Sequence, residues 1–470
     1  MAQKSFVIKS FTGMSEFEDK GLPGAFKYGQ SLDVRKTTDS LSCQQGVVDE
    51  GAGVVVDLVR FIIPCTDTNS YGFGNAGKIY KRTSAGVWSV VYTDTDGAIT
   101  GAAQWFLNNG KEYLFWTTAT KLKCKEIPGN TGWSDVNANA GGQAYPKTNL
   151  TSSTYHTMVQ AVGSLMICNG NFLAMVGYDG SYTPEAVDIY PTEYTKTLIE
   201  RGNYVVIGCP KDNDVPESDI VEWNTTDNSI NTRKNVKGGA INALIDTDQS
   251  LMQVGTKGAI YYGDLQNVLP IVMIHGGGYC DVASVTNDDG LALFGIGGNS
   301  SDRSGIYSYG RKELNRDRTL NMEYLLGTGS NDVISGALCK VGSDILMCYE
   351  ESSSFYADRV DSTSKATGYY YSLDLKAPTG LNYVPIWGPV ILNMKALPAG
   401  CSVECYYKLD KDGDFIQAKL EGGDTTFSTT DGTEAVFLVG EKAKVFEVEL
   451  KLTPSTNETP EIYQIEILIE

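Results

Sequence analysis

Three aspartates and one glutamate in the segment LDKDGDFIQAKLE have the spacing of calcium ligands. Asp410, Asp412 and Asp414 stand at positions 1, 3 and 5 of a calcium-binding loop, and position 12 is Glu421. Such a loop needs a glycine at position 6 for its sharp turn, but Phe415 stands there, between flanks that alternate as strands do. A β-hairpin with an Asp-Gly turn explains the segment better. We assign no metal ligand, and whether this turn binds a cation stays open.

A glycine-rich segment, GFGNAGKI, has the spacing of a phosphate-binding loop through Gly72, Gly77 and Lys78. That loop needs Ser or Thr after the lysine to hold magnesium, and it needs a helix to follow. Ile79 takes the place of the hydroxyl residue, and KIYKR is typical of a strand. We therefore expect a glycine-rich turn between two strands, and we assign no cofactor-binding residue and no cofactor.

The run HGGGYCD is similar to the glycine-rich oxyanion loops of esterases. The sequence contains no Gly-x-Ser-x-Gly motif to supply their serine nucleophile, so a tight turn explains the glycines. His156 and His275 are the only histidines, which leaves almost no material for histidine metal sites or for Ser-His-Asp catalysis. We assign no catalytic residue and expect His275 to be structural.

The ten cysteines include no Cys-x-x-Cys pair, and most lie in strand-like runs such as SLMICNG. Free cysteine behaves as a small hydrophobic residue, so we expect reduced, buried thiols. Cys401 and Cys405 are an even number of residues apart and would share one face of a strand. A metal or a disulfide at that pair is the minor alternative.

Carboxylates are frequent in turn-like segments such as DTDTDG and DNDVPESD. Two acids held about 5–10 Å apart in a cleft can hydrolyse a glycosidic bond, but the sequence does not place them, and most acids in turns are solvated. The repeat SxDxGxTW of sialidase propellers is only faintly matched by SAGVW at 84–88, which lacks the aspartate. An enzyme therefore has little specific support.

The charge of the chain argues against a nucleic-acid partner. Lys and Arg total 38 and Asp and Glu total 57, a net charge of −19, whereas phosphate backbones are bound by clustered cations. The first residues lack the apolar region of a signal peptide, and no apolar run approaches the roughly 20 residues that span a bilayer. We expect a protein made in a cytoplasm, with no nucleic-acid or membrane partner.

The elements that would position functional residues repeat along the chain. Each of seven units combines a first strand, a polar turn, an apolar second strand, a longer connection and a third strand that often carries aromatic residues. Two units share a glycine turn before a Trp that begins the next strand, at Gly86–Trp88 and at Gly132–Trp133. The units start near residues 54, 102, 157, 197, 241, 282 and 333, and a spacing of about 40–55 residues fits propeller blades.

The composition of these units follows from the physics of a blade. Neighbouring blades pack face to face, so their inner strands are buried on both sides and become continuous apolar runs. Short turns explain the Gly, Asn and Asp between strands, and ring closure protects the strand edges. We predict an all-β chain with a β-propeller of about seven blades at residues 46–365. Six or eight blades, and a string of β-sandwiches, stay open.

The pattern changes after about residue 375, where the Pro-punctuated segment KAPTGLNYVPIWGPVILNMK leads into a new region. The segments CSVECYYKL, KVFEVELKL and EIYQIEILIE alternate apolar and polar residues, which is typical of a sheet with one buried face. We predict a small C-terminal β-sandwich at residues 375–470.

Residues 1–45 form an N-terminal arm with too little contiguous apolar sequence for a domain of its own. Its strand-like segment KSFVIKSF would place Phe6 and Ile8 on one side and Val7 and Lys9 on the other. We expect this strand to join an outer blade and close the ring, because an edge strand needs a partner. The alternative is that it reaches a neighbouring subunit.

A set of apolar, glycine and charged residues forms a distinct phrase in the N-terminal segment: Phe11, Gly13, Gly24, Leu32, Asp33, Arg35, Leu41, Gln45 and Gly46. This phrase resembles the region that precedes a β-propeller in virion proteins of tailed bacteriophages, with the form F.GG…gaf.yg.nLDvR…g.L..rqG. GMS replaces the double glycine of that form. YYKLDKDGDFIQAKL is similar to the strand-turn-strand of small sandwiches appended to phage tail and neck proteins, with Phe415 in place of their final Trp.

The resemblance implies a non-enzymatic structural virion protein, present as a symmetric homo-oligomer that contacts other virion proteins through its blade faces and its arm. It implies no catalytic residue. We therefore expect a virion component, in the tail or at the head–tail junction. The alternative is a propeller that binds or cleaves a glycan of the host surface. Which virion component it is, and its copy number and symmetry, stay open.

Overall fold

The computed structural model shows β-strands as the only regular elements among the residues that it describes. The chain forms two compact units. The propeller unit consists of Asp49–Ser304 and Leu326–Arg359, and the terminal unit consists of Met1–Val48, Gly305–Leu325 and Val360–Glu470. The described residues are 4–15, 17–21, 23–34, 39–129, 132–133, 135–137, 139–189, 194–211, 217–227, 229–237, 239–247, 250–255, 259–263, 268–274, 278–298, 304–311, 318–328, 332–376 and 384–469.

These units differ from the linear division into residues 1–45, 46–365 and 375–470 expected from the sequence. The terminal unit combines segments from both ends and from the middle of the chain. The segments from the two ends share one apolar core, and the middle segment joins them by strand pairing. Within the described residues, no helix has the length and apolarity that a membrane crossing requires.

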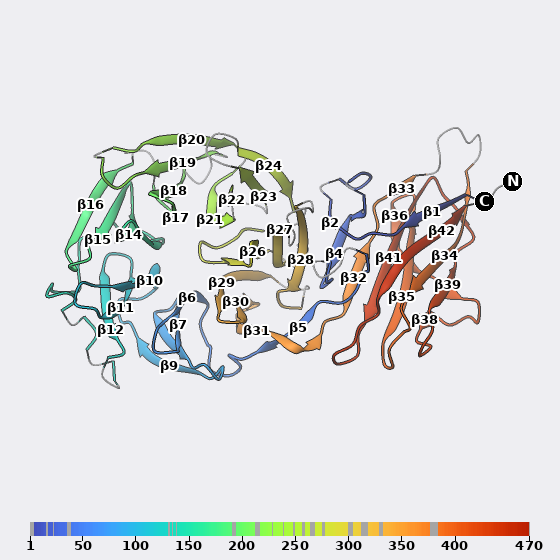
Figure 1. Cartoon of the computed structure of the whole chain (residues 1–470), viewed down its shortest axis with the longest axis horizontal. Helices are drawn as coiled ribbons and strands as arrows, with labels where there is room; N and C mark the ends of the chain where they lie inside the picture. Colours follow the sequence, from blue (N-terminus) through green and yellow to red (C-terminus); the bar gives the residue numbers. More distant parts are fainter. Residues whose placement is uncertain are drawn as a thin grey trace. The chain divides into compact units, whose positions relative to one another are not determined.

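Seven inner strands form a closed ring in the propeller unit (Figure 1). Each inner strand contacts the next one along the chain, and the last contacts the first, which closes the ring. A propeller of seven blades is thus confirmed. The inner strands are β6 (Val59–Pro64), β10 (Gly101–Phe106), β13 (Met158–Ala161), β17 (Thr197–Arg201), β21 (Ile241–Thr247), β25 (Val285–Asp288) and β29 (Val333–Val341).

From each inner strand the chain turns back, so that neighbouring strands of a blade are antiparallel. Second strands are buried along their length where blades pack on both sides, as every residue of β11 and of β26 shows. The further strands of this unit are β7 (Ser70–Gly74), β8 (Lys78–Arg82), β9 (Trp88–Thr93), β11 (Glu112–Thr117), β12 (Leu122–Ile127), β14 (Ser164–Asn169), β15 (Phe172–Val176), β16 (Tyr182–Asp188), β18 (Tyr204–Pro210), β19 (Glu217–Trp223), β20 (Thr232–Lys237), β22 (Ser250–Gly255), β23 (Ala259–Gly263), β24 (Val268–Met273), β26 (Leu291–Ile296) and β30 (Asp344–Glu351).

The second blade differs from its neighbours because its sheet has three described strands, β10, β11 and β12. Trp88 begins β9 as expected, but the expectation that Trp133 begins a strand is wrong, since Trp133 lies in a bend. Its indole instead stacks on Tyr92 of the first blade, with ring centroids 5.7 Å apart, and lies 6.2 Å from the ring of Trp116. Aromatic packing between two blades therefore takes the place of strand pairing.

The strand that completes the seventh sheet comes from the N-terminal side of the chain. This strand, β5 (Gln45–Asp49), pairs with β31 (Ser354–Lys365), and Glu50 N donates to Ala357 O at 3.0 Å. The expectation that KSFVIKSF closes the ring is wrong, because β1 (Lys4–Ile8) pairs with β42 (Ile462–Ile469) in the terminal unit. Phe6 then stacks on Trp387, with centroids 5.8 Å apart, which gives this strand its own apolar partner.

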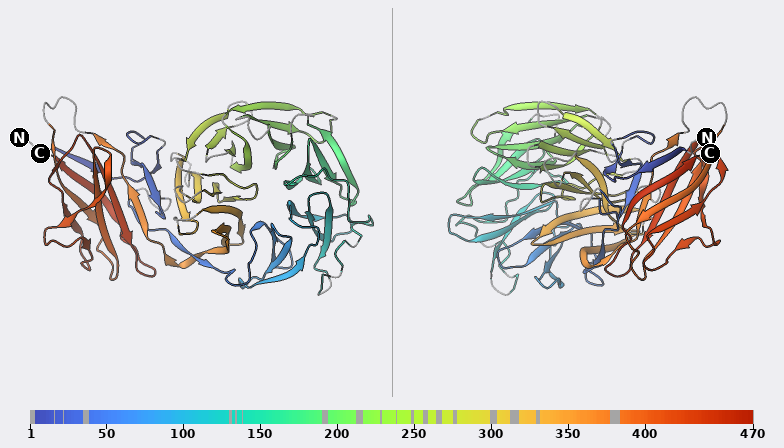
Figure 2. Two further views of the ribbon diagram at one scale, coloured as in Figure 1. Left: turned by 180° about the vertical axis from the view of Figure 1, so that it is seen from behind. Right: turned by 45° about the vertical axis from the view of Figure 1, so that its right-hand side comes forward.

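Two sheets pack face to face in the terminal unit, and Figure 2 shows them from two further directions. Trp387 of one sheet stacks on Phe446 of the other at 4.7 Å, inside a core that also contains Phe11, Leu32 and Leu41 of the arm. The first sheet contains β1, β42, β34 (Ile386–Met394), β39 (Glu434–Leu438), β37 (Lys419–Leu420) and β40 (Glu441–Lys442). The second contains β36 (Asp412–Gln417), β35 (Ser402–Leu409), β41 (Val445–Thr453), β32 (Gly368–Tyr371), β4 (Tyr28–Gln30), β33 (Leu375–Lys376) and β38 (Thr426–Phe427).

A segment from the middle of the chain completes the terminal unit. β28 (Thr319–Leu325) pairs with β27 (Gly305–Gly310) and with β2 (Gly13–Met14), and β2 pairs with β3 (Ala25–Phe26). Asn321 Nδ2 donates to Leu32 O at 3.0 Å, so the arm is hydrogen-bonded to this segment as well. The arm thus takes its order from the core and strands of the terminal unit.

Candidate functional site

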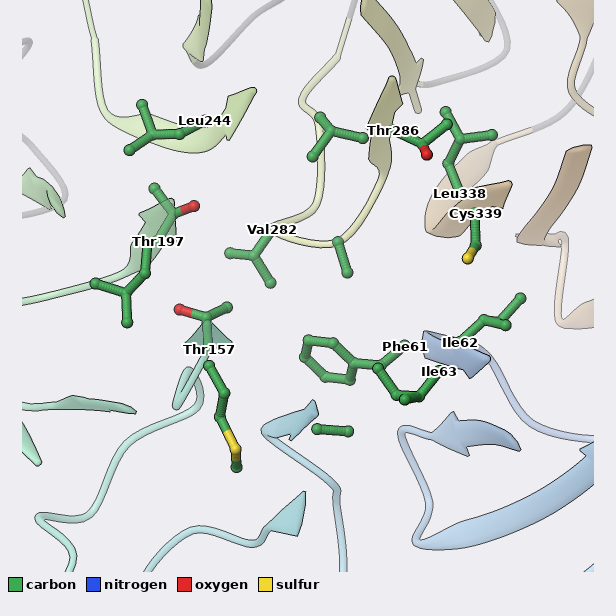
Figure 3. A pocket seen from close by; sticks show the side chains of 15 residues that line it. Phe61, Ile62, Ile63, Thr157, Thr197, Leu244, Val282, Thr286, Leu338 and Cys339 are labelled. Carbon is green, nitrogen blue, oxygen red and sulfur yellow. The ribbon is translucent and has the colours of Figure 1, made fainter. Parts of the chain in front are cut away.

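A cavity of about 250 Å³ lies among the inner strands of the propeller unit. All seven inner strands contribute to its lining, together with Thr157 before β13 and with Val282 and Ala283 before β25. Figure 3 shows Phe61, Thr157 and Val282 pointing into the same space. Apolar side chains dominate, with threonine hydroxyls between them. This axial cavity is below the range of about 300–1,000 Å³ that is usual for drug-sized ligands, so it fits a smaller molecule.

Polar residues cluster where the inner strands begin. We call Arg60, Tyr155, Lys196, Asn242 and Asp281 the axial cluster. Arg60, Lys196 and Asp281 each directly precede a residue that lines the cavity. Arg60 belongs to the first blade and contacts Asp281, at the start of the sixth, and Tyr155, before the third. These contacts therefore join blades that are not neighbours, although no residue of the cluster itself lines the cavity.

Arg60 and Asp281 form a bidentate ion pair. Arg60 Nε donates to Asp281 Oδ2 at 3.0 Å, and Arg60 Nη2 donates to Oδ1 at 3.1 Å. Both side chains are 9% exposed. Burial by itself would lower the pKa of Arg60, but the charge and hydrogen bonds of Asp281 raise it above its ordinary value. The guanidinium therefore stays charged, and its charge is balanced within the cluster.

Lys196 is the second cation of the axial cluster. Its Nζ donates to Asn242 Oδ1 at 2.5 Å and lies 4.5 Å from the ring centroid of Tyr155. Neither partner carries a negative charge, and no ion pair joins Lys196 to any other described residue. Burial lowers the pKa of Lys196, against the opposing charge of Asp281. The cluster thus holds two basic side chains and one carboxylate.

No residue of the axial cluster was predicted from the sequence to be functional, although one feature of the sequence pointed to Arg60. Arg60 interrupts the otherwise apolar run LVRFII, and a charge inside a buried strand needs a partner. Asp281 follows the HGGGYC run and stands before β25. Lys196 and Asn242 carry no comparable signal, because their meeting depends on the closure of the ring.

The glycine-rich segment at 72–79 forms the connection between β7 and β8, which confirms the expected turn between strands. Gly77 has a φ of +85°, and a Cβ there would come within 2.7 Å of two backbone oxygens, those of Asp94 and Gly97. The glycine is therefore required by the backbone of the turn. Lys78 lies in a strand and not at the start of a helix.

The segment with calcium-ligand spacing forms a β-hairpin, as expected, but the turn lies two residues earlier than the Asp-Gly pair. Asp410 and Lys411 have φ values of +49° and +63°, and Leu409 pairs with Asp412 across a two-residue turn. Asp410 Oδ1 accepts hydrogen bonds from the backbone N–H groups of Lys444 and Val445. No group of three or more potential metal-ligating side chains occurs in the part of the chain that the structure describes.

His156 is fully buried and held by two hydrogen bonds. Its Nε2 donates to Thr151 O at 2.9 Å, and its Nδ1 lies 2.9 Å from Thr100 Oγ1. Burial lowers the pKa of His156 to about 4, so the ring is neutral near pH 7 and serves the packing of the second blade. His275 lies outside the described residues.

All ten cysteines are free, and eight of them are buried. Burial raises the pKa values of several of these thiols, including Cys124 and Cys168, each to about 12. Cys401 and Cys405 both lie in the core of the terminal unit, and neither is in a disulfide. The expectation of reduced, buried thiols is met at these positions.

No family model and no curated protein matches the chain. Among solved structures it is similar to a streptogramin B lyase, with a TM-score of 0.46 and 10% identity over 68% of this chain and 98% of that chain. It is also similar to the WD40 β-propeller domain of Doa1, with a TM-score of 0.46 and 12% identity over 67% and 97%. For U3-55K the TM-score is 0.48 and the identity is 12%, over 67% of this chain and 97% of that chain. Identities this low concern the fold alone.

Proposed function

We propose that the protein is a non-enzymatic structural component of a bacteriophage virion, in the tail or at the head–tail junction. In this role it forms a symmetric homo-oligomer and contacts other virion proteins. The observation that carries the proposal is the resemblance of its N-terminal phrase to phage virion proteins whose arm precedes a propeller.

The positions of that phrase support a shared architecture. Phe11, Leu32 and Leu41 have no exposed surface and belong to the core of the terminal unit. Gly24 has a φ of +81°, and a Cβ there would come within 2.4 Å of Ser10 Oγ. The matching residues thus occupy positions where this fold restricts the side chain. Arg35 lies outside the described residues.

Two strands at the ends of sheets support assembly with other chains. β1 is the end strand of its sheet, and Val7 on it is 44% exposed. β5 is the end strand of the seventh blade, and its Val47 and Val48 are 39% and 40% exposed. An end strand with exposed apolar residues offers backbone groups to a strand of another chain.

Mass spectrometry of gradient-purified particles from the phage that encodes the chain tests the proposal. The protein should be present in a fixed ratio to portal and tail-tube proteins. Its absence from purified particles, with the protein abundant in the lysate, would overturn the proposal. The neighbouring genes give an independent check, since portal, capsid and tail-tube genes should lie beside this one.

Light scattering of the purified protein after size exclusion tests assembly directly. Val7→Lys places a charge on the end strand β1 and should shift an oligomer toward the monomer. Val87→Lys, at a residue that is 61% exposed in the turn before β9, is the matched control and should leave the oligomer unchanged. A monomer at all concentrations for the unmodified chain would contradict the homo-oligomer.

The rival function, a propeller that binds or cleaves a host glycan, is tested with the same preparation. Retention on a carbohydrate array, or release of reducing sugar from host-surface polysaccharide, would favour the rival. A protein that is a constant part of the particle and inactive in both assays would favour the structural role.

A further inference from the structure

A second cavity of about 250 Å³ lies within the terminal unit, and we call it the polar cavity. Nine of the ten described residues that line it have polar side chains, and the tenth is Pro398. Its volume is below the range of about 300–1,000 Å³ that is usual for drug-sized ligands. Size and lining together therefore favour a small polar molecule.

The N-terminal arm supplies two serines to this cavity. Leu41 exchanges two backbone hydrogen bonds with Ile462, of 2.8 and 3.0 Å, and both Leu41 and Cys43 lie in the apolar core. Side chains alternate between two sides along an extended chain. Ser40 and Ser42 therefore point away from the core and line the polar cavity.

The hydroxyl groups of these two serines are available to a ligand. Ser40 is 2% exposed and Ser42 is 7% exposed, and neither hydroxyl makes a hydrogen bond to any residue that the structure describes. The hydroxyl of Thr459 differs, because it accepts from Cys43 N at 2.8 Å and donates to Pro460 O at 3.1 Å. Buried hydroxyls without a partner are costly, so the two serines indicate a place for a polar molecule.

Two opposite charges line the polar cavity without pairing. Lys395 Nζ pairs with Glu461 Oε1 at 3.0 Å, and Asp33 is engaged in an interaction as well. The remaining charged residues of the lining are Lys365 and Glu458. Neither of them forms an ion pair with a described residue, so one ammonium group and one carboxylate stay available.

Each of these two charges acts on a different neighbour. Burial raises the pKa of Cys43 to about 11, and the positive charge of Lys365 opposes this rise. The hydrogen bond and charge of Glu461 raise the pKa of Lys395, and the negative charge of Glu458 adds to this rise. The two available charges thus belong to different parts of the lining.

We propose that the polar cavity binds a small α-amino acid as its zwitterion, with the carboxylate at Lys365 and the ammonium group at Glu458. An ammonium group only donates hydrogen bonds and an ionised carboxylate only accepts them, so each end of the ligand meets its complement. A simple anion would face Glu458, and a simple cation would face Lys365. The hydroxyls of Ser40 and Ser42 can donate to the carboxylate of the ligand. The proposal concerns the terminal unit alone and does not depend on a role in a virion.

The lining decides which amino acid fits best. Pro398 is the one apolar side chain among the described lining residues, so a large apolar side chain would be placed against polar groups. It would gain little from burial and would leave those groups without partners. A hydroxyl group both donates and accepts hydrogen bonds. L-serine therefore fits the polar cavity better than L-leucine does.

Isothermal titration calorimetry of the full chain with L-serine tests this inference. We expect saturable binding at a single site and weaker binding of L-leucine. L-serinamide lacks the carboxylate and N-acetyl-L-serine lacks the ammonium group, so each should bind about tenfold more weakly or less. Inorganic phosphate and glucose should not bind at the same concentrations.

Lys365→Met tests the residue that contacts the carboxylate. It should weaken L-serine binding about tenfold, because it removes a charge-assisted hydrogen bond. In this variant L-serine and L-serinamide should bind with equal affinity, since the group that distinguishes them is gone. The matched control is Lys419→Met, at an exposed lysine of the terminal unit, and it should bind L-serine as the unmodified chain does.

Glu458→Gln keeps the test decisive if Lys365→Met fails to fold, because Glu458 is exposed and its replacement should leave the fold intact. An exposed charge contributes less, so we expect L-serine binding to weaken about threefold to fivefold. Glu421→Gln, at another exposed glutamate, is its control. Absence of saturable L-serine binding, or equal affinity of the unmodified chain for L-serine, L-serinamide and N-acetyl-L-serine, would overturn the proposal. Tighter binding of phosphate or glucose than of L-serine would also overturn it.

Discussion

Glu50 and Arg82 form a bidentate ion pair at the closure of the propeller. Arg82 Nε donates to Glu50 Oε2 at 2.7 Å, and Arg82 Nη2 donates to Oε1 at 3.1 Å. Arg82 lies in β8 of the first blade and also contacts Asp344 of the seventh at 2.8 Å, while Glu50 contacts Arg359 of β31. Since Glu50 directly follows the closing strand β5, this network joins the first and last blades.

Replacing Glu50 should destabilise the propeller strongly. Arg82 is 3% exposed, and Glu50→Ala would leave its guanidinium buried with a weaker set of partners. Removing one member of a buried ion pair costs about 3–5 kcal/mol of stability. We therefore expect the free energy of unfolding, measured by urea denaturation, to fall by about 3 kcal/mol.

The matched control is Glu126→Ala, because Glu126 pairs with Lys111 on the surface of the second blade. An exposed pair contributes about 0–1 kcal/mol, so this variant should unfold close to the unmodified chain. Equal unfolding free energies for the Glu50 and Glu126 variants would show that the network does not hold the closure.

Phe6 should anchor the first strand of the chain. Its ring stacks on Trp387, and Phe6→Ala removes this contact at a half-buried position, with an expected cost of about 2 kcal/mol. Hydrogen exchange of the amides in β42 measures the effect locally, because β1 pairs with that strand. We expect faster exchange in the variant.

Val7→Ala provides the control for this experiment on the same strand. Val7 points to the opposite side of β1 and is 44% exposed, so the change should alter stability by about 0.5 kcal/mol or less. If both variants exchange at the rate of the unmodified chain, the strand is not held by the Phe6 contact.

The positions of the blades could be predicted from the sequence because the signal is local. Inner and second strands are continuous apolar runs, and three observed starts, at 197, 241 and 333, coincide with those read from the sequence. The largest difference is in the first blade, where the strand starts at 59 and residue 54 is the expected start. There, VVVDL extends the apolar run, but its first residues form a turn before the strand.

Strand partners could not be predicted, because pairing is not encoded in one segment. The alternation in KSFVIKSF correctly separates Phe6 and Ile8, which are partly buried, from exposed Val7. It does not say which sheet offers the matching edge. The axial cluster could not be predicted from the sequence for the same reason. Lys196 contacts Asn242 and Tyr155 only because blades three, four and five lie side by side in the folded ring.

The hairpin with calcium-ligand spacing should be stabilised by its own hydrogen bonds and not by a metal. Asp410 adopts a positive φ and accepts two backbone hydrogen bonds, and the ammonium group of Lys411 pairs with Glu18 at 2.7 Å. Asp410→Ala should lower the free energy of unfolding by about 1 kcal/mol, because alanine tolerates a positive φ poorly and its side chain accepts no hydrogen bond. Thermal unfolding measures this loss.

Asp410→Asn is the control for that variant, since asparagine tolerates a positive φ and keeps a side-chain oxygen acceptor. Its melting temperature should stay near that of the unmodified chain. We expect millimolar calcium to leave all three melting temperatures unchanged. A calcium-dependent rise for the unmodified chain that Asp410→Asn abolishes would instead identify a cation site.

Asp358 should make the stability of the propeller depend on pH. Its side chain is buried, Tyr349 Oη donates to Oδ2 at 3.0 Å, and Oδ1 has no hydrogen-bond partner among the described residues. Burial raises the pKa of Asp358 to about 7, and the charge of Asp49 acts in the same direction. In the unfolded chain the pKa of an aspartate is about 3.9. Between these values the folded state binds more protons than the unfolded state, so its stability falls as pH rises.

Asp358→Asn removes this titratable group. The difference in unfolding free energy between the variant and the unmodified chain therefore reports the titration of Asp358 alone. From about pH 4 to about pH 7 the unmodified chain should lose stability relative to the variant by up to about 1.4 kcal/mol per pH unit. Urea unfolding at pH 5 and at pH 8 measures the difference. Asp431→Asn, at an exposed turn residue, should follow the pH profile of the unmodified chain. Parallel profiles for the Asp358 variant and the unmodified chain would mean that the carboxyl group is ionised in the folded protein and has found a partner for Oδ1.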